Sequence, residues 1–519
     1  MSEYHGGLFL GFSACVPKGL IPDGLYFSLL CPPINVNRDG SVKFATCGIR
    51  KIEAALLNHG FRRKDVIVAH PEHIDKVVGP NTKVVGIAEN DPLGVAPATS
   101  SFTALLGGEA YMAIKFRELL CHPAIKKSKP KIVVGGPGAW QLESVETLKE
   151  LGIDCLVVGE GEKVVGPIFE KASKGEPLPK IVHGEVVPEE EIPTISGPTI
   201  CGLVEIARGC GRGCAFCLPT LQTYRSLSID HILKEVDVNL RAGRQPLLHA
   251  EDVLSYKAKG FRVNKEAVIN LFRTVQNHPG VKMTSLSHIA LSSVSEAPEV
   301  VEEISNILSL GEKAPWTAAQ TGIETGSPKL IEKHMAGKCK PFKPEDWPKV
   351  VVDSFETLSK NNWLPCGTLI LGLPDETEKD VELTIKLVKE LKSYKSLIVP
   401  LFLVSSGRLK NRADSFTLEN MTNKHYMLYL KCWEHNLNWA PALIQDYSRI
   451  TIKGKVIQYG LKLFFSYGIK QTKELIRKCR EDYDYDLPTM LRDVKSGKIT
   501  VTHSLPARLA YRLAKLRTR

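Results

Sequence analysis

The chain reads Glu205-Ile206-Ala207-Arg208-Gly209-Cys210-Gly211-Arg212-Gly213-Cys214-Ala215-Phe216-Cys217 at the end of a short predicted strand. Its three cysteines have the spacing C-x3-C-x2-C. Iron–sulfur clusters are normally held by four thiolates, so three thiolates leave one iron of a [4Fe-4S] cluster open to a substrate or cofactor. The glycines let the loop fold tightly, and the charges of Arg208 and Arg212 favour thiolates. We therefore expect Cys210, Cys214 and Cys217 to ligate such a cluster.

The same thiols also allow a zinc knuckle or three buried cysteines. A structural zinc site needs a fourth Cys or His nearby, and the nearest histidine, His231, lies in a predicted helix. The other ten of the 13 cysteines are scattered singly, and each is interpreted as a small buried hydrophobe.

The cysteine loop resembles the signature of the radical S-adenosylmethionine (SAM) family, with Phe216 as the aromatic residue before the last cysteine. Three further segments are similar to strand ends of that family: 248–255, 320–327 and 367–377, the last with Asp375 in place of the usual glycine. The resemblance implies that SAM binds the open iron. It also implies SAM contacts from Phe216, Gln320, Gly322, Glu324, Gly372 and Leu373.

Strand-like and helix-like segments alternate from residue 201 to 406. The six predicted strands are 203–207, 247–253, 281–286, 317–323, 366–371 and 398–404. This alternation predicts an α/β fold with a partial or full parallel barrel, in which ligands bind at the carboxyl ends of the strands.

The first 175 residues show a second α/β pattern, typical of a Rossmann-like domain. We expect strands at 66–69, 83–88, 131–136 and 155–159, and helices at 48–59, 102–120 and 144–151. Ligands of such sheets bind beyond the strand ends, so the loops 90–101, 135–140 and 159–162 form the candidate pocket.

Gly135-Gly136-Pro137-Gly138 and Val158-Gly159-Glu160-Gly161-Glu162 resemble turns of the cobalamin-binding domain that precedes many radical SAM barrels. The usual histidine of the first motif is Gly138 here. No Asp-x-His-x-x-Gly occurs, so no histidine is expected below cobalt; its lower face is left empty, water-bound or capped by the 90–101 loop. A Rossmann-like domain with ordinary turns, or one that binds a nucleotide, is the alternative, although Gly-x-Gly-x-x-Gly is absent. The resemblance implies cobalamin contacts from Asn90, Thr99, Ser100, Ser101, Gly135, Gly136, Pro137, Gly138, Gly159, Glu160, Gly161 and Glu162.

A Pro-rich, acidic segment at 176–200 is interpreted as a linker, and residues 407–519 as a helical C-terminal domain. Its aromatic residues form either a packed cap or a substrate groove: Trp433, Trp439, Tyr447, Phe464, Phe465 and Tyr467. This domain order resembles methanogen enzymes that C-methylate residues of methyl-coenzyme M reductase, notably a glutamine.

The resemblance implies a methyltransferase that acts on an unactivated sp3 carbon through a 5'-deoxyadenosyl radical and methylcobalamin. Its partners would be a peptide or protein substrate and a low-potential electron donor. One alternative is a tRNA methylthiotransferase, whose second cluster would use Cys15, Cys47 and Cys121. The other is a non-catalytic cobalamin or iron–sulfur sensor or carrier.

The composition and charge of the chain argue against some classes of partner and location. The 519 residues carry a formal charge of +11 without a dense basic block, which does not indicate nucleic acid as a partner. No apolar run approaches the roughly 20 residues of a membrane span. Without a signal-peptide pattern at the start, we expect a cytoplasmic protein.

Overall fold

The structure is a computed structural model that describes residues 13–411, 414–451, 455–496 and 498, without the side chains of 29, 30, 219, 447–465, 494 and 495. Its first unit contains a parallel sheet in the order β1-β2-β3-β4. The strands are β1 (Val84–Ala88), β2 (Lys131–Gly135), β3 (Cys155–Gly159) and β4 (Ile181–Gly184).

Helices cover both faces of this sheet, because its central strands are apolar on both sides. One face packs against α4 (Tyr111–Leu120), α5 (Pro123–Ser128) and α6 (Val145–Leu151). The other face packs against α7 (Val165–Ser173), with α2 (Cys47–His59) behind it. The short helix α1 (Asp23–Leu25) and α3 (Pro97–Leu106) complete the unit.

The second unit is a partial barrel of six parallel strands, which confirms all six strands predicted there. They are β5 (Leu203–Glu205), β8 (Leu247–His249), β9 (Ser285–Leu286), β10 (Thr317–Glu324), β11 (Trp363–Leu371) and β12 (Leu397–Phe402). Two three-stranded sheets, β5-β8-β9 and β10-β11-β12, are joined by a bridge between His288 and Gln320. The ribbon β6 (Ala207–Arg208) and β7 (Arg225–Ser226) flanks the cysteine loop.

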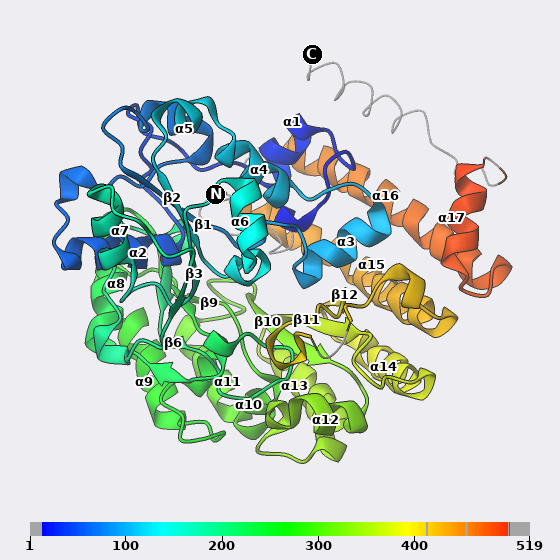
Figure 1. Ribbon diagram of the computed structural model, residues 1–519. Coiled ribbons are helices and arrows are strands. Elements are labelled where there is room, and N and C mark those ends of the chain that lie inside the picture. The colour runs from blue at the N-terminus through cyan, green and yellow to red at the C-terminus, as the bar shows by residue number, and fades with distance from the viewer. Residues whose placement is uncertain (1–12, 412–413, 452–454, 497, 499–519) are drawn as a thin grey trace.

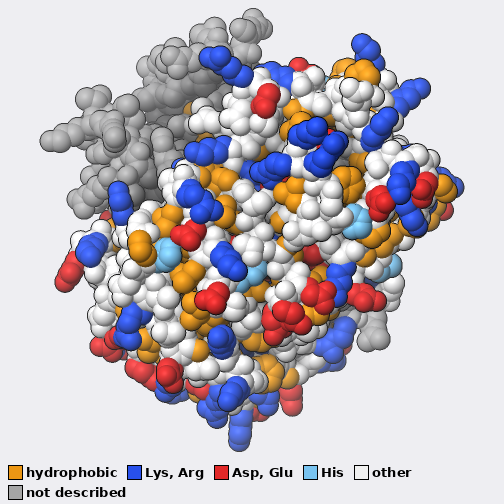
Figure 2. All heavy atoms as spheres, turned by 90° about the vertical axis from the view of Figure 1, so that its left-hand side faces the viewer, with side chains coloured by type: hydrophobic (Ala, Val, Ile, Leu, Met, Phe, Trp, Pro, Cys, Tyr) orange, Lys and Arg blue, Asp and Glu red, His pale blue; other side chains and the backbone are white. Residues whose placement is uncertain are grey.

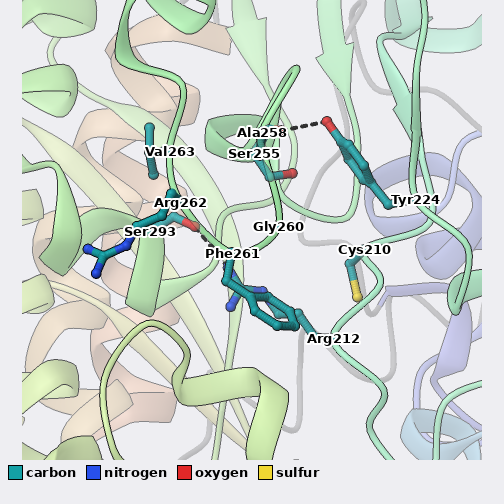
Figure 3. A pocket seen from close by; sticks show the side chains of 10 residues that line it. All are labelled: Cys210, Arg212, Tyr224, Ser255, Ala258, Gly260, Phe261, Arg262, Val263 and Ser293. Carbon is teal, nitrogen blue, oxygen red and sulfur yellow. Dashed lines mark hydrogen bonds between the residues drawn. The ribbon is translucent and has the colours of Figure 1, made fainter.

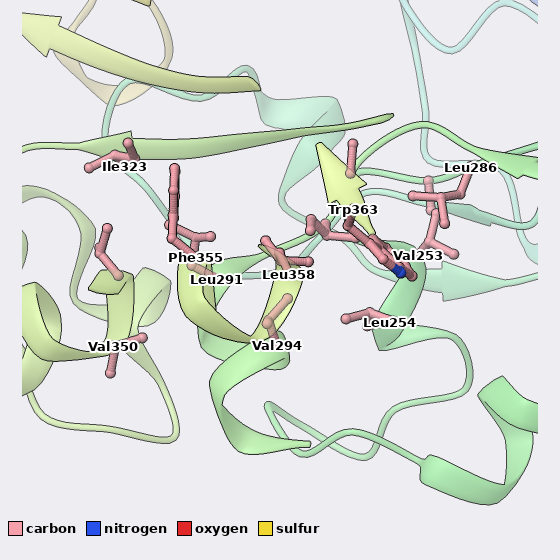
Figure 4. Close-up of a cluster of buried hydrophobic side chains, with 14 of the residues drawn as sticks. Val253, Leu254, Leu286, Leu291, Val294, Ile323, Val350, Phe355, Leu358 and Trp363 are labelled. Carbon is pink, nitrogen blue, oxygen red and sulfur yellow. The ribbon is translucent and has the colours of Figure 1, made fainter. Parts of the chain in front are cut away.

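Barrel helices lie between these strands on the outside (Figure 1). They are α8 (Ile229–Arg241), α9 (Lys265–Gln276), α10 (Leu291–Glu296), α11 (Pro298–Leu308), α12 (Pro328–Cys339), α13 (Trp347–Lys360) and α14 (Glu378–Glu390). Their apolar sides form one large core with the strands, in which Trp363, Phe355 and Leu358 are fully buried (Figure 4). This core fixes the positions of the strand ends that carry the site.

Three predicted elements differ from the observed ones. Residues 66–69 form no strand, and only Ala69 pairs, with Ser41. The helix expected at 102–120 is divided into α3 and α4, because Gly107 and Gly108 interrupt it with left-handed φ values. The segment interpreted as a linker contributes β4, which pairs in parallel with β3.

The C-terminal region is helical, as expected, over α15 (Asn423–Thr451), α16 (Lys455–Asp482) and α17 (Leu487–Lys495). Helix α15 packs on α14 and β12. Trp433 is exposed, and Trp439 and Tyr467 are half-buried, whereas the side chains of Tyr447, Phe464 and Phe465 lie outside the described residues.

The surface gives little sign of a single-sign electrostatic field. On the face shown in Figure 2, Lys and Arg side chains are interspersed with Asp and Glu. Within the described part of the chain, no helix is both long and apolar enough to span a bilayer.

Candidate active site

The cysteine loop follows β6 and turns tightly, as its glycines predict. Gly209, Gly211 and Gly213 have φ values of 72°, 67° and 69°, a region that side chains rarely adopt. A Cβ on Gly209 would lie 2.2 Å from the carbonyl oxygen of Thr223, so this glycine also permits close backbone approach.

Segments distant in sequence hold the loop. The Ala215 amide donates to the His334 carbonyl at 2.8 Å, and the Ala215 carbonyl accepts from the Arg408 amide at 2.8 Å. The Ser406 hydroxyl donates to the Phe216 carbonyl at 2.7 Å. A Cβ on Gly407 would lie 2.1 Å from the Cys217 carbonyl oxygen. The segment after the last barrel strand therefore packs directly on the loop after the first.

The three thiols differ in acidity. A hydrogen bond from Cys217 lowers the pKa of Cys214 to about 7, and Lys338 and Arg212 act in the same direction against burial. The same contact with Cys214, together with burial, raises the pKa of Cys217, and burial raises that of Cys210. Arg212 thus has the predicted effect on these thiols. Arg208 binds carboxylates instead.

Lys338, on α12, is a residue that sequence reasoning missed. Its ammonium lies 3.0 Å from the carboxylate of Glu324, with side-chain exposures of 16% and 9%. Glu324 also accepts a hydrogen bond from Thr368 at 3.3 Å and has a φ of 63° where the β10 register shifts. A Cβ on Gly322 would lie 1.9 Å from Oε1 of Glu324 and 2.5 Å from Nζ of Lys338. The glycine therefore makes room for this buried ion pair beside the thiols.

Arg212 anchors the other side of the loop. Its guanidinium lies 3.3 Å from Asp252 and donates to the carbonyls of Lys338 and Lys340. Its own carbonyl passes so close to Gly337 that a Cβ there would lie 1.9 Å away. That glycine is the one sequence signal that could have indicated close approach of the Lys338 segment.

The chemistry of these donors fits an iron–sulfur cluster. Three cysteines share one tight loop, and one of them has a pKa near neutrality, which favours the thiolate that binds metal. A structural zinc site would need a fourth Cys or His ligand beside the three thiols. The nearest histidine in the sequence, His231, instead contacts Lys51 and Glu235.

The other residues predicted to contact SAM lie on the same barrel. Phe216 is half-buried against the main core, and Leu373 is buried. The Gln320 backbone amide donates to the Ser287 carbonyl and its carbonyl accepts from the Ile289 amide, so its backbone lies between the segment after β9 and β11. Gly372 has a φ of 83°, and a Cβ there would lie 2.0 Å from the Phe416 ring. These residues remain predicted contacts.

The glycine turns of the first unit pack closely against neighbouring backbone. A Cβ on Gly136 would lie 2.8 Å from the Glu89 amide nitrogen, and one on Gly138 would lie 2.6 Å from the Asn90 backbone. A Cβ on Gly159 would lie 2.6 Å from the Gly184 carbonyl oxygen. Packing alone therefore accounts for these three glycines. Gly135 is half-buried, Pro137 is exposed, and Gly161 packs against Ile52.

The segment predicted as the loop 90–101 is a loop only as far as Ala96, because residues 97–101 form the first turns of α3, which meets the barrel. Asn90 is exposed, Ser100 is half-buried, and Thr99 is fully buried. The Ser101 hydroxyl donates to Pro97 and accepts from the Phe402 amide at 2.7 Å, so this side chain joins the first unit to β12.

Glu160 and Glu162, two predicted cobalamin contacts, bind arginines of the barrel. Glu160 lies 2.6 Å from Arg225 and 2.9 Å from Arg208, and it accepts from the Val187 amide. Glu162 lies 2.8 Å from Arg208. We call the set Glu160, Glu162, Arg208 and Arg225 the interdomain clamp.

A second buried group of charges lies below the clamp. Lys51 of α2 donates to Glu235 of α8 at 2.5 Å and lies 3.7 Å from Glu205, which binds Arg208 at 2.9 Å. Burial opposes the ionisation of Glu205, but Arg208 and Lys51 outweigh it and lower its pKa to about 2.

Three of the contacts between the units lie at the carboxyl ends of strands. Glu160 follows β3, Ser101 lies beyond β1, and Glu143, beyond β2, lies 2.6 Å from Lys410. Their partners Arg208, Phe402 and Lys410 lie at or beyond carboxyl ends of barrel strands. The carboxyl edges of the two sheets therefore face each other.

Comparison with known proteins agrees with this architecture. Residues 204–388 match the family model of the radical SAM superfamily. This part of the chain is a radical SAM domain. A solved structure of the radical SAM methyltransferase TsrM from Kitasatospora setae, with cobalamin and a [4Fe-4S] cluster bound, is similar over 70% of this chain and 71% of that one, with a TM-score of 0.50 and 13% identity. At that identity the likeness shows a shared fold, which extends beyond the radical SAM domain.

Curated relatives carry two kinds of name. An uncharacterized methyltransferase of Pyrococcus horikoshii is 25% identical over 60% of this chain and 66% of its own length. A putative methylthiotransferase of Methanocaldococcus jannaschii is 27% identical over 50% of this chain and 58% of its own. The chain thus spans less than two thirds of either relative.

Proposed function

We propose that this protein is a cobalamin-dependent radical SAM methyltransferase. The observation that carries the proposal is the opposition of two carboxyl edges, one with the three-thiol loop and the Glu324–Lys338 pair, the other with the turns 89–101, 135–143 and 159–162. Because open α/β sheets bind ligands at these edges, a cofactor on one sheet would face a cofactor on the other.

Each set of residues has a defined task in this proposal. When bound, the cluster and SAM would supply a 5'-deoxyadenosyl radical, and cobalamin would supply a transferable methyl group. Cys210, Cys214 and Cys217 would hold the cluster, and Glu324 would bind polar groups of SAM. The interdomain clamp joins the two edges through buried ion pairs, and cofactors bound between the edges would be shielded from bulk water.

The identity of the substrate is a more specific part of the proposal. The helical C-terminal region following the barrel supports a protein substrate, and our specific hypothesis remains an sp3 carbon such as that of a glutamine in methyl-coenzyme M reductase. Methylation of a polypeptide carbon replaces one hydrogen with a methyl group and would be detected as a net mass increase of one CH2 unit.

A methylthiotransferase is the second candidate, favoured by the names of several relatives. A methylthiotransferase would need a second cluster, and its candidate ligands in this chain are Cys15, Cys47 and Cys121. Cys47 lies beside Lys51 and Glu205, Cys15 lies beside Thr99 and Asp91, and Cys121 is exposed. These three cysteines therefore lie in different surroundings. A sensor or carrier is disfavoured, because neither role needs the strand ends arranged for SAM.

The deciding experiment measures iron and cobalt in protein purified anaerobically from cells supplied with cobalamin. We expect about four irons and one cobalt per chain, together with S-adenosylhomocysteine and 5'-deoxyadenosine when SAM and a reductant are added. About eight irons without cobalt would contradict the proposal and favour the methylthiotransferase.

A further inference from the structure

Cys210 lines a small open recess on the outer side of the radical SAM domain. The recess is bordered by Tyr224, Arg212 and a loop at 256–263 that carries Phe261 (Figure 3). Cys214 is buried, and Cys217 is half-buried like Cys210, but Cys210 is the cysteine that lines the recess. The recess is therefore a short route from the surface to the cysteine loop.

The loop at 256–263 is well anchored. The Tyr256 hydroxyl donates to the Leu227 carbonyl at 2.9 Å, and the Asn264 side chain donates to the Lys257 carbonyl at 3.1 Å. The Lys257 amide donates to Ser226 at 3.0 Å, and Lys259 pairs with Arg262 in an antiparallel bridge. A surface held in this way is pre-organised and loses little entropy when a partner binds.

The loop combines positive charge with an exposed aromatic ring. It reads Tyr256-Lys257-Ala258-Lys259-Gly260-Phe261-Arg262-Val263 and contains no acidic residue. Lys257, Lys259 and Arg262 are exposed, and Phe261 is 37% exposed with Arg212 over its ring. Arg262 extends away from the recess and binds Glu296, and Asp252 is paired with Arg212. Among the described residues, no carboxylate forms an ion pair with Lys257 or Lys259, so these two lysines carry the unpaired positive charge of the loop.

We propose that the 256–263 loop is the docking surface for a small, acidic electron-transfer protein. The inference rests on the proposed function, because the cluster must be reduced by one electron for each SAM that it cleaves. The carrier is oxidised by one electron and the cluster is reduced by one. Basic rim charges steer an acidic partner, and Phe261 provides an apolar contact at the centre of a small, transient interface.

The test reverses the two free charges and compares two reductants. In Lys257→Glu/Lys259→Glu, SAM cleavage driven by an acidic two-cluster ferredoxin should fall about tenfold at low salt, while cleavage driven by dithionite stays unchanged. The wild-type rate with ferredoxin should fall as salt is added, and the variant should lose most of this dependence. Lys126→Glu/Lys127→Glu, on the exposed side of α5, is the matched control with the same charge change and should behave as wild type.

The outcomes separate the two proposals. An unchanged ferredoxin rate in the loop variant, or an equal loss with both reductants, would overturn the docking surface and leave the methyltransferase proposal intact. Absence of SAM cleavage by iron-loaded wild-type protein with either reductant would overturn the proposed function itself. Phe261→Ser is the second probe, and it should raise the ferredoxin concentration needed for half-maximal rate without changing the dithionite rate.

Discussion

The two α/β units use glycine at their strand ends for different purposes. In the radical SAM domain, Gly322 leaves space that the Glu324–Lys338 pair occupies, so the missing side chain positions a polar group. In the first unit, Gly136, Gly138 and Gly159 leave space that neighbouring backbone fills. The same residue type at the same topological position therefore makes room either for a polar side chain or for neighbouring backbone.

The largest effect should come from the thiol loop. Cys214→Ala removes the most acidic of the three thiols, and with two ligands left the cluster should be lost together with SAM cleavage, a decrease of more than about 100-fold. Iron content and 5'-deoxyadenosine, measured by chromatography, check this expectation. Cys121→Ala, at an exposed position, should match wild type. Retained deoxyadenosine formation in the Cys214 variant would refute the cluster assignment.

A somewhat smaller effect should come from the interdomain clamp. Glu160→Gln leaves Arg225, whose side chain is 6% exposed, without its carboxylate partner, and such losses cost about 3–5 kcal/mol. We expect a lower thermal midpoint and faster proteolysis between the units, measured by scanning fluorimetry and limited trypsin digestion. Glu150→Gln, on the exposed side of α6, is the control and should change neither. Equal thermal midpoints for the two variants would mean that the interdomain clamp does not stabilise the contact between the units.

Acid should weaken the same interface. The pKa of Glu205 is lowered in the folded protein to about 2 from an ordinary 4.5, so its contribution to stability is complete above about pH 4.5 and is lost as the pH falls toward 2. The thermal midpoint should therefore fall between pH 4.5 and the acid limit of the measurement. Glu205→Gln should show a shallower fall over this range, and identical profiles would contradict the assignment.

Gly322→Ala should sharpen the contrast between the two kinds of glycine. The added methyl group would displace Glu324 and Lys338, so we expect SAM binding to weaken by about tenfold while the iron content is kept. Equilibrium dialysis with labelled SAM measures the change. Unchanged affinity would mean that the ion pair has no part in SAM binding.

The smallest effect should come from Gly213→Ala. The nearest atom to an added Cβ lies 3.9 Å away, so only the φ of 69° opposes the substitution, at a cost of about 1 kcal/mol. Gly48→Ala, in helix α2 with no atom within 4 Å, should instead stabilise the protein slightly. If the thermal midpoints of the Gly213 and Gly48 variants shifted in the same direction, the left-handed φ of Gly213 would not be the source of the cost.

Sequence alone predicted the barrel well, because its strands are buried and read as apolar runs ending in glycine or polar turns. The run 66–69 looks the same but forms no strand, since a strand also needs a partner of matching length and only Ser41 pairs with it. The division of the helix at Gly107 and Gly108 does have a sequence signal, because two adjacent glycines disfavour a continuous helix.

The site was predictable where its residues are close in sequence. The cysteine loop is such a case, and its glycines adopt the expected left-handed conformation. Lys338 was not predictable, because an ordinary lysine on a helix gives no sign that folding brings it to Glu324. The same holds for Arg208 and Arg225, whose pairing with Glu160 joins residues 48 and 65 positions apart.

The contact of Ser406, Gly407 and Arg408 with the cysteine loop has a consequence for the order of assembly. Phe216 and Ser406 are separated by 190 positions in the chain, so this contact can form only after all six barrel strands have been synthesised and have paired. A nascent chain released before residue 408 would lack the Ser406 and Arg408 contacts that hold the loop at Phe216 and Ala215. Metal loading in the cell should therefore follow closure of the barrel rather than guide it.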